Sequence, residues 1–254
     1  SGYHYSDSII YGFSHTHLSG TGVSDYGDIA FLPYVGNDLS LDKVKSIVSE
    51  GIPFSHKNEV AKAGYYSVVL QNGIKVELTS TLRAGIQRYT FPNKEKAYIT
   101  LNLKHRDKLL NGTIHKMDSI TYQGHRSSTS WAKHQTVYYH FQVSKPPISE
   151  KVIKSKEGDE LLIMEFNVNR NEEILIQTGI SGTDGGGAIR NLENEIKHFE
   201  FDRTKINANA IWNKKMKSIL TYGGSKEEKT IFYTALYHCM IHPSIFSDVD
   251  GRYR

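Results

Sequence analysis

Hydrophobic and polar residues alternate along the middle of the chain, between residue 65 and about residue 180. The alternation is strictest in four runs, at residues 74–79, 99–104, 137–143 and 162–168. A period of two places one set of side chains in a core and the other in solvent, which is typical of antiparallel sheets. Many such strands at short spacing, with no helical pattern between them, predict a mainly β fold, an antiparallel β-sandwich.

A turn signal separates two of these runs at Asn72 and Gly73. Both residue types tolerate a positive φ, which a type I′ turn requires at its two central positions. The dipeptide therefore predicts a β-hairpin with a type I′ turn.

The hydrophobic period changes after residue 180. A first helix is indicated by one stripe of apolar residues, Ile189, Leu192, Ile196 and Phe199. A second stripe predicts a helix over about residues 203–220, through Trp212, Met216 and Ile219. Both stripes follow the helical spacing of three to four residues.

A third helix is predicted to begin at Ser225, since Ser225 and Glu228 have the spacing of a capping box. Pro243 ends it. Its apolar positions predict a core face made of Ile231, Phe232, Ala235, Leu236, Cys239 and Met240. We expect Cys239, the single cysteine, to be a small buried hydrophobe, and it excludes an internal disulfide.

The composition is that of a globular protein, with 38% hydrophobic and 23% charged residues. No run of eighteen apolar residues occurs, so no membrane span is expected. The net charge is only +4, and the lysines are scattered along the chain. A nucleic-acid partner is disfavoured, because the phosphate backbone requires a concentrated basic surface. The chain does not begin with Met and its last eight residues are rich in turn formers, so we interpret it as part of a longer protein.

Two polar segments have compositions that a plain sandwich does not need. Residues 12–22 hold three glycines and two histidines, His15 and His17. Such a loop can bring donors and acceptors close to a ligand, or it can be a connection whose histidines bond to the backbone. His15 and His17 would share a face of an extended segment and could bind a metal, but no third ligand has suitable spacing.

The second polar segment, residues 246–253, places Asp248, Asp250 and Arg252 in one turn. These side chains could hold a polyol by bidentate hydrogen bonds, or they could form a capped and solvated turn. The spacing does not fit the calcium loop of an EF-hand, which needs a glycine at its sixth position and a glutamate at its twelfth.

Residues 1–7 and 12–22 closely resemble the N-terminal region of glycoside hydrolase family 92, a family of exo-α-mannosidases. The resemblance continues, in the right order, through residues 54–59, 63–68, 88–92, 230–238 and 246–253. It implies a β-sandwich, a helical linker and a C-terminal (α/α)6 barrel, with the active site between the domains. It also implies hydrolysis of α-mannosidic bonds with inversion, and dependence on calcium.

The resemblance assigns no catalytic residue and no metal ligand to this chain, because the family's acid, base and most of its calcium ligands are expected beyond Arg254. Carried over by motif, Asp248, Asp250 and Arg252 are expected to contact hydroxyls of the terminal mannose. The loop containing His15 and His17, together with His4, is expected to face the same pocket. The implied partners are a mannose-containing glycan, with α-1,2-type linkage expected, and the catalytic domain of the same protein.

The domains expected on this basis are a sandwich over residues 1–182, a helical linker over residues 183–222 and the start of the barrel over residues 223–254. The protein is expected to be periplasmic, secreted or on the cell surface. Two other classes stay open: a free-standing carbohydrate-binding module, and a cupin-like metal enzyme that uses His15 and His17.

Overall fold

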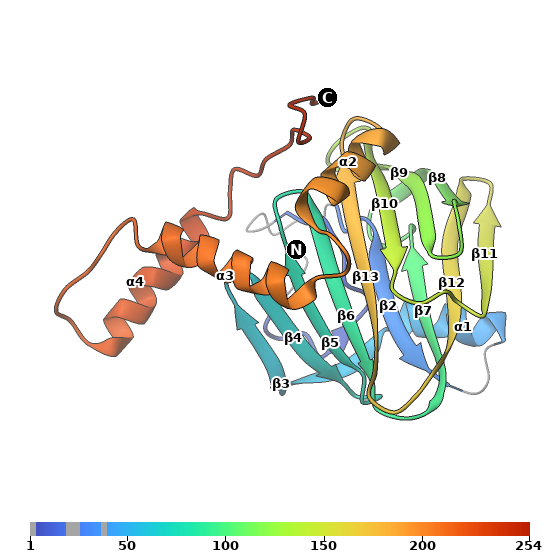
Figure 1. The fold of residues 1–254 in the computed structure, drawn as a ribbon, viewed down its shortest axis with the longest axis horizontal. Coiled ribbons are helices and arrows are strands. Elements are labelled where there is room, and N and C mark those ends of the chain that lie inside the picture. Colours follow the sequence, from blue (N-terminus) through green and yellow to red (C-terminus); the bar gives the residue numbers. More distant parts are fainter. Residues whose placement is uncertain (1–3, 19–25, 37–39) are drawn as a thin grey trace.

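The computed structural model describes residues 4–18, 26–36 and 40–254, and Figure 1 shows a two-layered β structure followed by helices. The described strands are β1 (Ile9–Ile10), β2 (Ala30–Val35), β3 (Ile52–Lys62), β4 (Tyr65–Leu70), β5 (Lys75–Ser80), β6 (Ala84–Phe91), β7 (Glu95–Asn102), β8 (Lys108–Lys116), β9 (Thr121–Thr129), β10 (Gln135–Val143), β11 (Ser149–Ser155), β12 (Gly158–Val168) and β13 (Glu172–Ser181). The mainly β, antiparallel fold is thus confirmed.

The strands form one hydrogen-bonded path that folds into two layers. The larger layer has the order β1-β3-β4-β5-β6-β13-β10-β9-β8, and the smaller one joins β11, β12, β7 and β2. The layers meet at one corner, where Gly112 of β8 pairs in parallel with Gly158 of β12. A Cβ at Gly158 would lie 2.3 Å from the carbonyl oxygen of Gly112, so the corner requires the close approach of two glycines.

The main core lies between the two layers. Phe31 of β2 meets Phe141 of β10 edge to face, with ring centroids 5.1 Å apart. On β10 the residues Tyr139, Phe141 and Val143 are fully buried. Helix α2 (Gly185–Glu195) lies over the other face of β10 (Figure 1). The period of two therefore separates the core from a second, helix-covered face.

The hairpin at Asn72 and Gly73 is confirmed, but its turn is not type I′. Gly73 donates its N–H to the Leu70 carbonyl, and Leu70 donates to the Ile74 carbonyl, so the loop has three residues. Only Gly73 has a positive φ, at 84°. This is a type I turn followed by a left-handed residue, in which Asn72 Oδ1 accepts the N–H of Ile74 at 3.2 Å.

Helices α2 and α3 (Phe201–Met216) cover the outer face of β13 and its neighbours (Figure 1). α2 ends at Glu195, earlier than its apolar stripe predicts, although Ile196 and Phe199 still pack in a small second core with Leu192, Phe201 and Ile86. His198 and Phe199 have positive φ values, so the chain turns sharply there and α3 starts at Phe201.

Helix α1 (Leu41–Glu50) was not predicted. Its signals in the sequence are an N-cap at Ser40 and Gly51 after its last residue.

Helix α4 (Lys226–Cys239) has the predicted capping box between Ser225 and Glu228. The predicted core face is wrong for the described chain, because none of the residues of α4 is buried. Cys239 is likewise exposed rather than buried. The reason is that α4 projects away from the sheet and packs weakly against α3 (Figure 1). No described helix combines the length and the apolar character that crossing a membrane requires.

Candidate functional site

The two polar segments lie at the same end of the sandwich, on either side of the start of β6. The ring of His15 packs against Gly85, where a Cβ would lie 2.9 Å from His15 Cδ2. Two residues earlier, Arg83 donates from Nε to the carbonyl oxygen of Ser247 at 2.6 Å. The fold thus places the segments that contain His15 and Asp248 beside the same end of β6.

Burial lowers the pKa of His17, and its electrostatic interaction with His242 lowers it further. This electrostatic contact is a second link between the N-terminal loop and the segment that follows α4. Residues 19–25, which include the Gly20, Thr21 and Gly22 part of the predicted loop, lie outside the described residues.

Asp248 is almost completely buried, with 2% of its surface exposed. Its Oδ2 accepts from the hydroxyl of Ser181 at 2.8 Å and from that of Thr183, and its Oδ1 accepts from Asn191 Nδ2 at 2.8 Å. Ser181 ends β13, and Asn191 lies on α2. Asp248 therefore fastens the C-terminal turn to the sandwich, because three donors satisfy its buried carboxylate.

Asp250 and Arg252 lie on the more exposed side of the same turn. Arg252 donates from Nη1 to Asp184 Oδ2 at 2.6 Å, and from Nε to Asp250 Oδ2 at 3.0 Å. Asp250 also accepts from Arg190 Nε at 3.0 Å. The hydrogen bond from Arg252 holds the pKa of Asp184 below its usual range. Charge-assisted hydrogen bonds between these alternating acidic and basic side chains fix their orientations.

His15 has an arrangement suited to accepting a hydrogen bond. Its Nδ1 lies 2.9 Å from the carbonyl oxygen of Ile29, which can only accept, so Nδ1 carries the proton. Burial lowers the pKa of His15 to about 4, and the ring is neutral at physiological pH. The buried Nε2 has no hydrogen-bond partner among the described residues and is left as an acceptor.

His4 lies elsewhere on the surface. Its Nδ1 is 2.7 Å from the hydroxyl of Ser6, within an exposed turn. The neighbouring Tyr5 stacks on His56 of β3, with ring centroids 4.4 Å apart. β3 is separated from β6 by β4 and β5, so the contacts of this turn are with the sheet edge and not with the start of β6.

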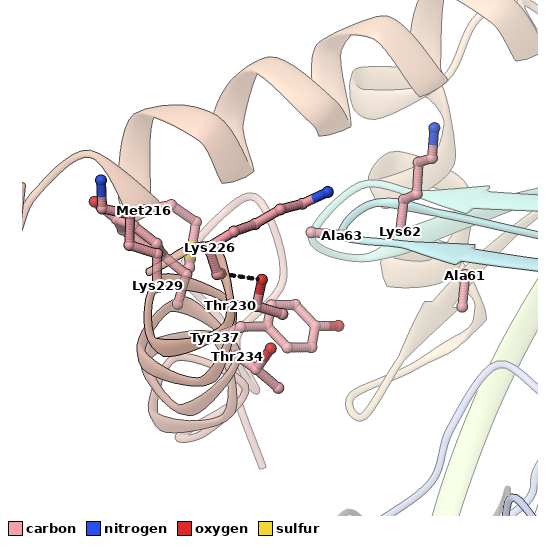
Figure 2. Close-up of a pocket in the computed structure, with 10 residues that line it drawn as sticks. Ala61, Lys62, Ala63, Met216, Lys226, Lys229, Thr230, Thr234 and Tyr237 are labelled. Carbon is pink, nitrogen blue, oxygen red and sulfur yellow. Dashed lines mark hydrogen bonds between the residues drawn. The ribbon is translucent and has the colours of Figure 1, made fainter. Parts of the chain in front are cut away.

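A cleft of about 740 Å³ lies between the β3–β4 turn, the end of α3 and α4 (Figure 2). Figure 2 shows Thr230 donating to the carbonyl oxygen of Lys226 beside it. The lining residues are Ala61, Lys62, Ala63, Met216, Lys226, Lys229, Thr230, Tyr233, Thr234 and Tyr237. The lining includes none of the site residues expected from the sequence and no carboxylate, so it supplies no acid–base pair for glycoside hydrolysis.

Sequence reasoning missed the residues that support the site, which are Arg83, Asp184 and Arg126, the buried partner of Asp28. Their side chains reach partners that are distant along the chain, so no local pattern indicates them. No three potential metal ligands cluster among the described residues.

Comparison with known proteins gives consistent results. The glycosyl hydrolase family 92 N-terminal domain matches residues 1–181, and the family 92 catalytic domain matches residues 187–254. An uncharacterized secreted glycosidase of Arthroderma benhamiae is 24% identical over 94% of this chain and 36% of its own length.

Among solved structures, a family GH92 alpha-mannosidase from Bacteroides thetaiotaomicron is 28% identical, with a TM-score of 0.89 over 100% of this chain and 37% of that protein. That enzyme has also been solved with mannoimidazole. A GH92 inverting mannosidase from the same organism shares the fold at 24% identity, with a TM-score of 0.84 over 98% of this chain and 35% of its own. The chain spans little more than a third of the length of these relatives, and it belongs to glycosyl hydrolase family 92.

Proposed function

We propose that this chain is the front part of an inverting exo-α-mannosidase that trims mannose from glycans, with α-1,2-type linkages as the expected substrate. The observation that carries the proposal is the meeting of the His15 and Asp248 segments at the start of β6. The 28% identity to a mannosidase that binds mannoimidazole supports mannose as the sugar. The name of the Arthroderma relative supports the secreted location among those expected.

In this proposal the predicted residues divide into binding and holding roles. Asp250 and Arg252, on the exposed side of the turn, bind hydroxyls of the terminal mannose. Asp248 holds that turn in place through its hydrogen bonds to Ser181, Thr183 and Asn191, in addition to any contact with the sugar. His15 accepts a hydrogen bond from a sugar hydroxyl at Nε2, and His17 extends the same surface. His4 lies in a turn that packs beside β3, away from the start of β6.

The acid, the base and the calcium of the reaction are expected outside the described residues. Inversion needs a general acid on the leaving oxygen and a general base that activates water, with their carboxyl groups about 6.5–9.5 Å apart. Bound calcium would supply Lewis-acid chemistry. The role of this chain in the reaction is to bind and orient the terminal sugar. Its proposed parts are the sandwich domain, a helical linker over residues 183–222 and the start of the barrel over residues 223–254.

The test is an assay of the full-length protein and of this chain alone on an aryl α-mannoside and on α-mannobiose, with calcium present. We expect the full-length protein to turn over both substrates and the isolated chain to turn over neither. No turnover by the full-length protein would contradict the mannosidase function, and turnover by the chain alone would contradict the missing acid–base pair. Submillimolar mannose binding by the chain alone, measured by calorimetry, would favour a carbohydrate-binding module.

A further inference from the structure

Arg126 of β9 is a charged side chain with no exposed surface. Its guanidinium pairs from Nη1 with Asp28, whose carboxylate is also fully buried. It donates from Nε to the carbonyl oxygen of Leu103 at 2.6 Å, and from Nη2 to that of Asp107 at 2.9 Å. These contacts fix the guanidinium on several sides.

Asp28 connects this arginine to the N-terminal loop. Its Oδ2 accepts from the hydroxyl of Thr16 at 2.6 Å, and its N–H donates to the same hydroxyl at 3.0 Å. Its carbonyl oxygen accepts the N–H of His15 at 2.9 Å. Thr16 stands between His15 and His17, so Asp28 holds the centre of the loop that carries both histidines.

The arginine also reaches the far side of the loop through Asp107. The carboxylate of Asp107 accepts the N–H of Tyr26 at 2.8 Å and Gln135 Nε2 at 3.1 Å. Tyr26 in turn forms a β-bridge with His17. One buried guanidinium is therefore linked to both described ends of the loop, before residue 19 and after residue 25.

We infer that Arg126 is a positioning residue that acts through Asp28 and Thr16 to hold His15 and His17 in their sugar-binding orientation. A buried ion pair is weak evidence for a role in stability, since apolar replacements are often equally stable. A binding residue, in contrast, must be held within a fraction of an ångström by supporting hydrogen bonds. This inference rests on the proposed function.

The test uses the full-length protein and the variants Thr16→Val, Thr16→Ser and Arg126→Lys. Thr16→Val keeps the shape of the side chain and removes the hydroxyl that bonds Asp28, whereas Thr16→Ser keeps the hydroxyl. The control Arg88→Lys alters the Glu77 pair beside α3, away from the loop. KM and kcat on α-mannobiose, the Kd of mannoimidazole and the melting temperature are measured for each.

We expect Thr16→Val to raise KM and Kd by about tenfold, because a hydrogen bond to a charged group is lost. Thr16→Ser is expected to stay near the wild type. Arg126→Lys is expected to raise KM, and the double variant Thr16→Val/Arg126→Lys should raise KM no further than the stronger single variant. Arg88→Lys lowers only the melting temperature. An unchanged KM and Kd for Thr16→Val, or additive effects in the double variant, would overturn the inference. Failure of the wild type to hydrolyse α-mannosides would instead overturn the proposed function.

Discussion

Arg83 links the start of β6 to the carbonyl oxygen of Ser247, 164 residues further along the chain, through a hydrogen bond of 2.6 Å. The same guanidinium pairs from Nη1 with Glu195 at the end of α2, at 2.8 Å. One side chain thus connects the sandwich, helix α2 and the polar C-terminal turn. The position of the candidate site depends on this contact.

Replacing Arg83 by Ala is expected to lower the free energy of unfolding by about 2–4 kcal/mol, because Glu195 is left mostly buried without its charged partner. Chemical denaturation of the chain measures the change. The control is Arg203→Ala, which removes an exposed pair with Glu200 and should cost less than about 0.5 kcal/mol. Equal effects of the two variants would show that Arg83 does not hold the turn.

Asp248 and Asp250 are expected to respond differently to replacement by Asn. Asp248→Asn places an NH₂ group among three donors in a buried site and should destabilise the protein by about 1–3 kcal/mol. Asp250→Asn should change stability by less than about 0.5 kcal/mol and act on KM in the full-length protein. Denaturation midpoints combined with kinetics on α-mannobiose separate the two roles. A loss of stability in Asp250→Asn that matches Asp248→Asn would contradict this division.

Gly85→Ala is expected to displace the ring of His15. The new Cβ would lie 2.9 Å from Cδ2 and 3.1 Å from Nε2 of His15, closer than van der Waals contact permits. We expect a loss of about 1–3 kcal/mol of stability and weaker binding of mannoimidazole by the full-length protein. The matched control is Gly36→Ala, where no atom of the described residues lies within 4 Å of the added Cβ. The double variant with His15→Ala should recover stability, and a failure to recover would place the clash elsewhere.

Stability should fall as the pH decreases from about 6.5 to about 4. Burial lowers the pKa of both His15 and His105 to about 4, and for His105 the charges of Arg106 and Arg126 lower it further. Between pH 6.5 and pH 4 these two imidazoles are protonated in the unfolded chain but stay neutral in the folded chain. The stability that they contribute above pH 6.5 is therefore lost on acidification. Each histidine contributes at most about 3 kcal/mol to this change.

Denaturation midpoints at pH 7 and pH 4.5 measure the effect, and His15→Gln should reduce the difference between them.

Two other groups titrate differently. Burial raises the pKa of Glu77, but its hydrogen bonds, above all the one from Arg88, lower it to about 2. Its contribution to stability is therefore lost only as the pH falls from 4.5 to 2. His56 acts in the opposite sense, because its hydrogen bond to Glu59 raises its pKa. An equal pH dependence in wild type and His15→Gln would show that the imidazole is not protected from protonation.

Much of the fold was predictable from local sequence. The alternation around Tyr139 and Phe141 identifies a strand with one buried face, and Ser225 with Glu228 identifies the start of α4. Each of these signals depends on residues within a few positions of one another, since strand and helix periods and caps are local properties. The resemblance added the order of the domains and the identity of the two polar segments, because those motifs are contiguous in the sequence.

The tertiary structure alone decided how the site is assembled. Asp28 and Arg126 are 98 residues apart, and Arg83 and Ser247 are 164 residues apart. These contacts depend on strand order and on the register of β6, β9 and β13, which no local pattern determines. The exposure of Cys239 also depends on tertiary contacts, since an apolar stripe indicates only that a helix face can be buried. Whether it is buried depends on which element the fold brings against it.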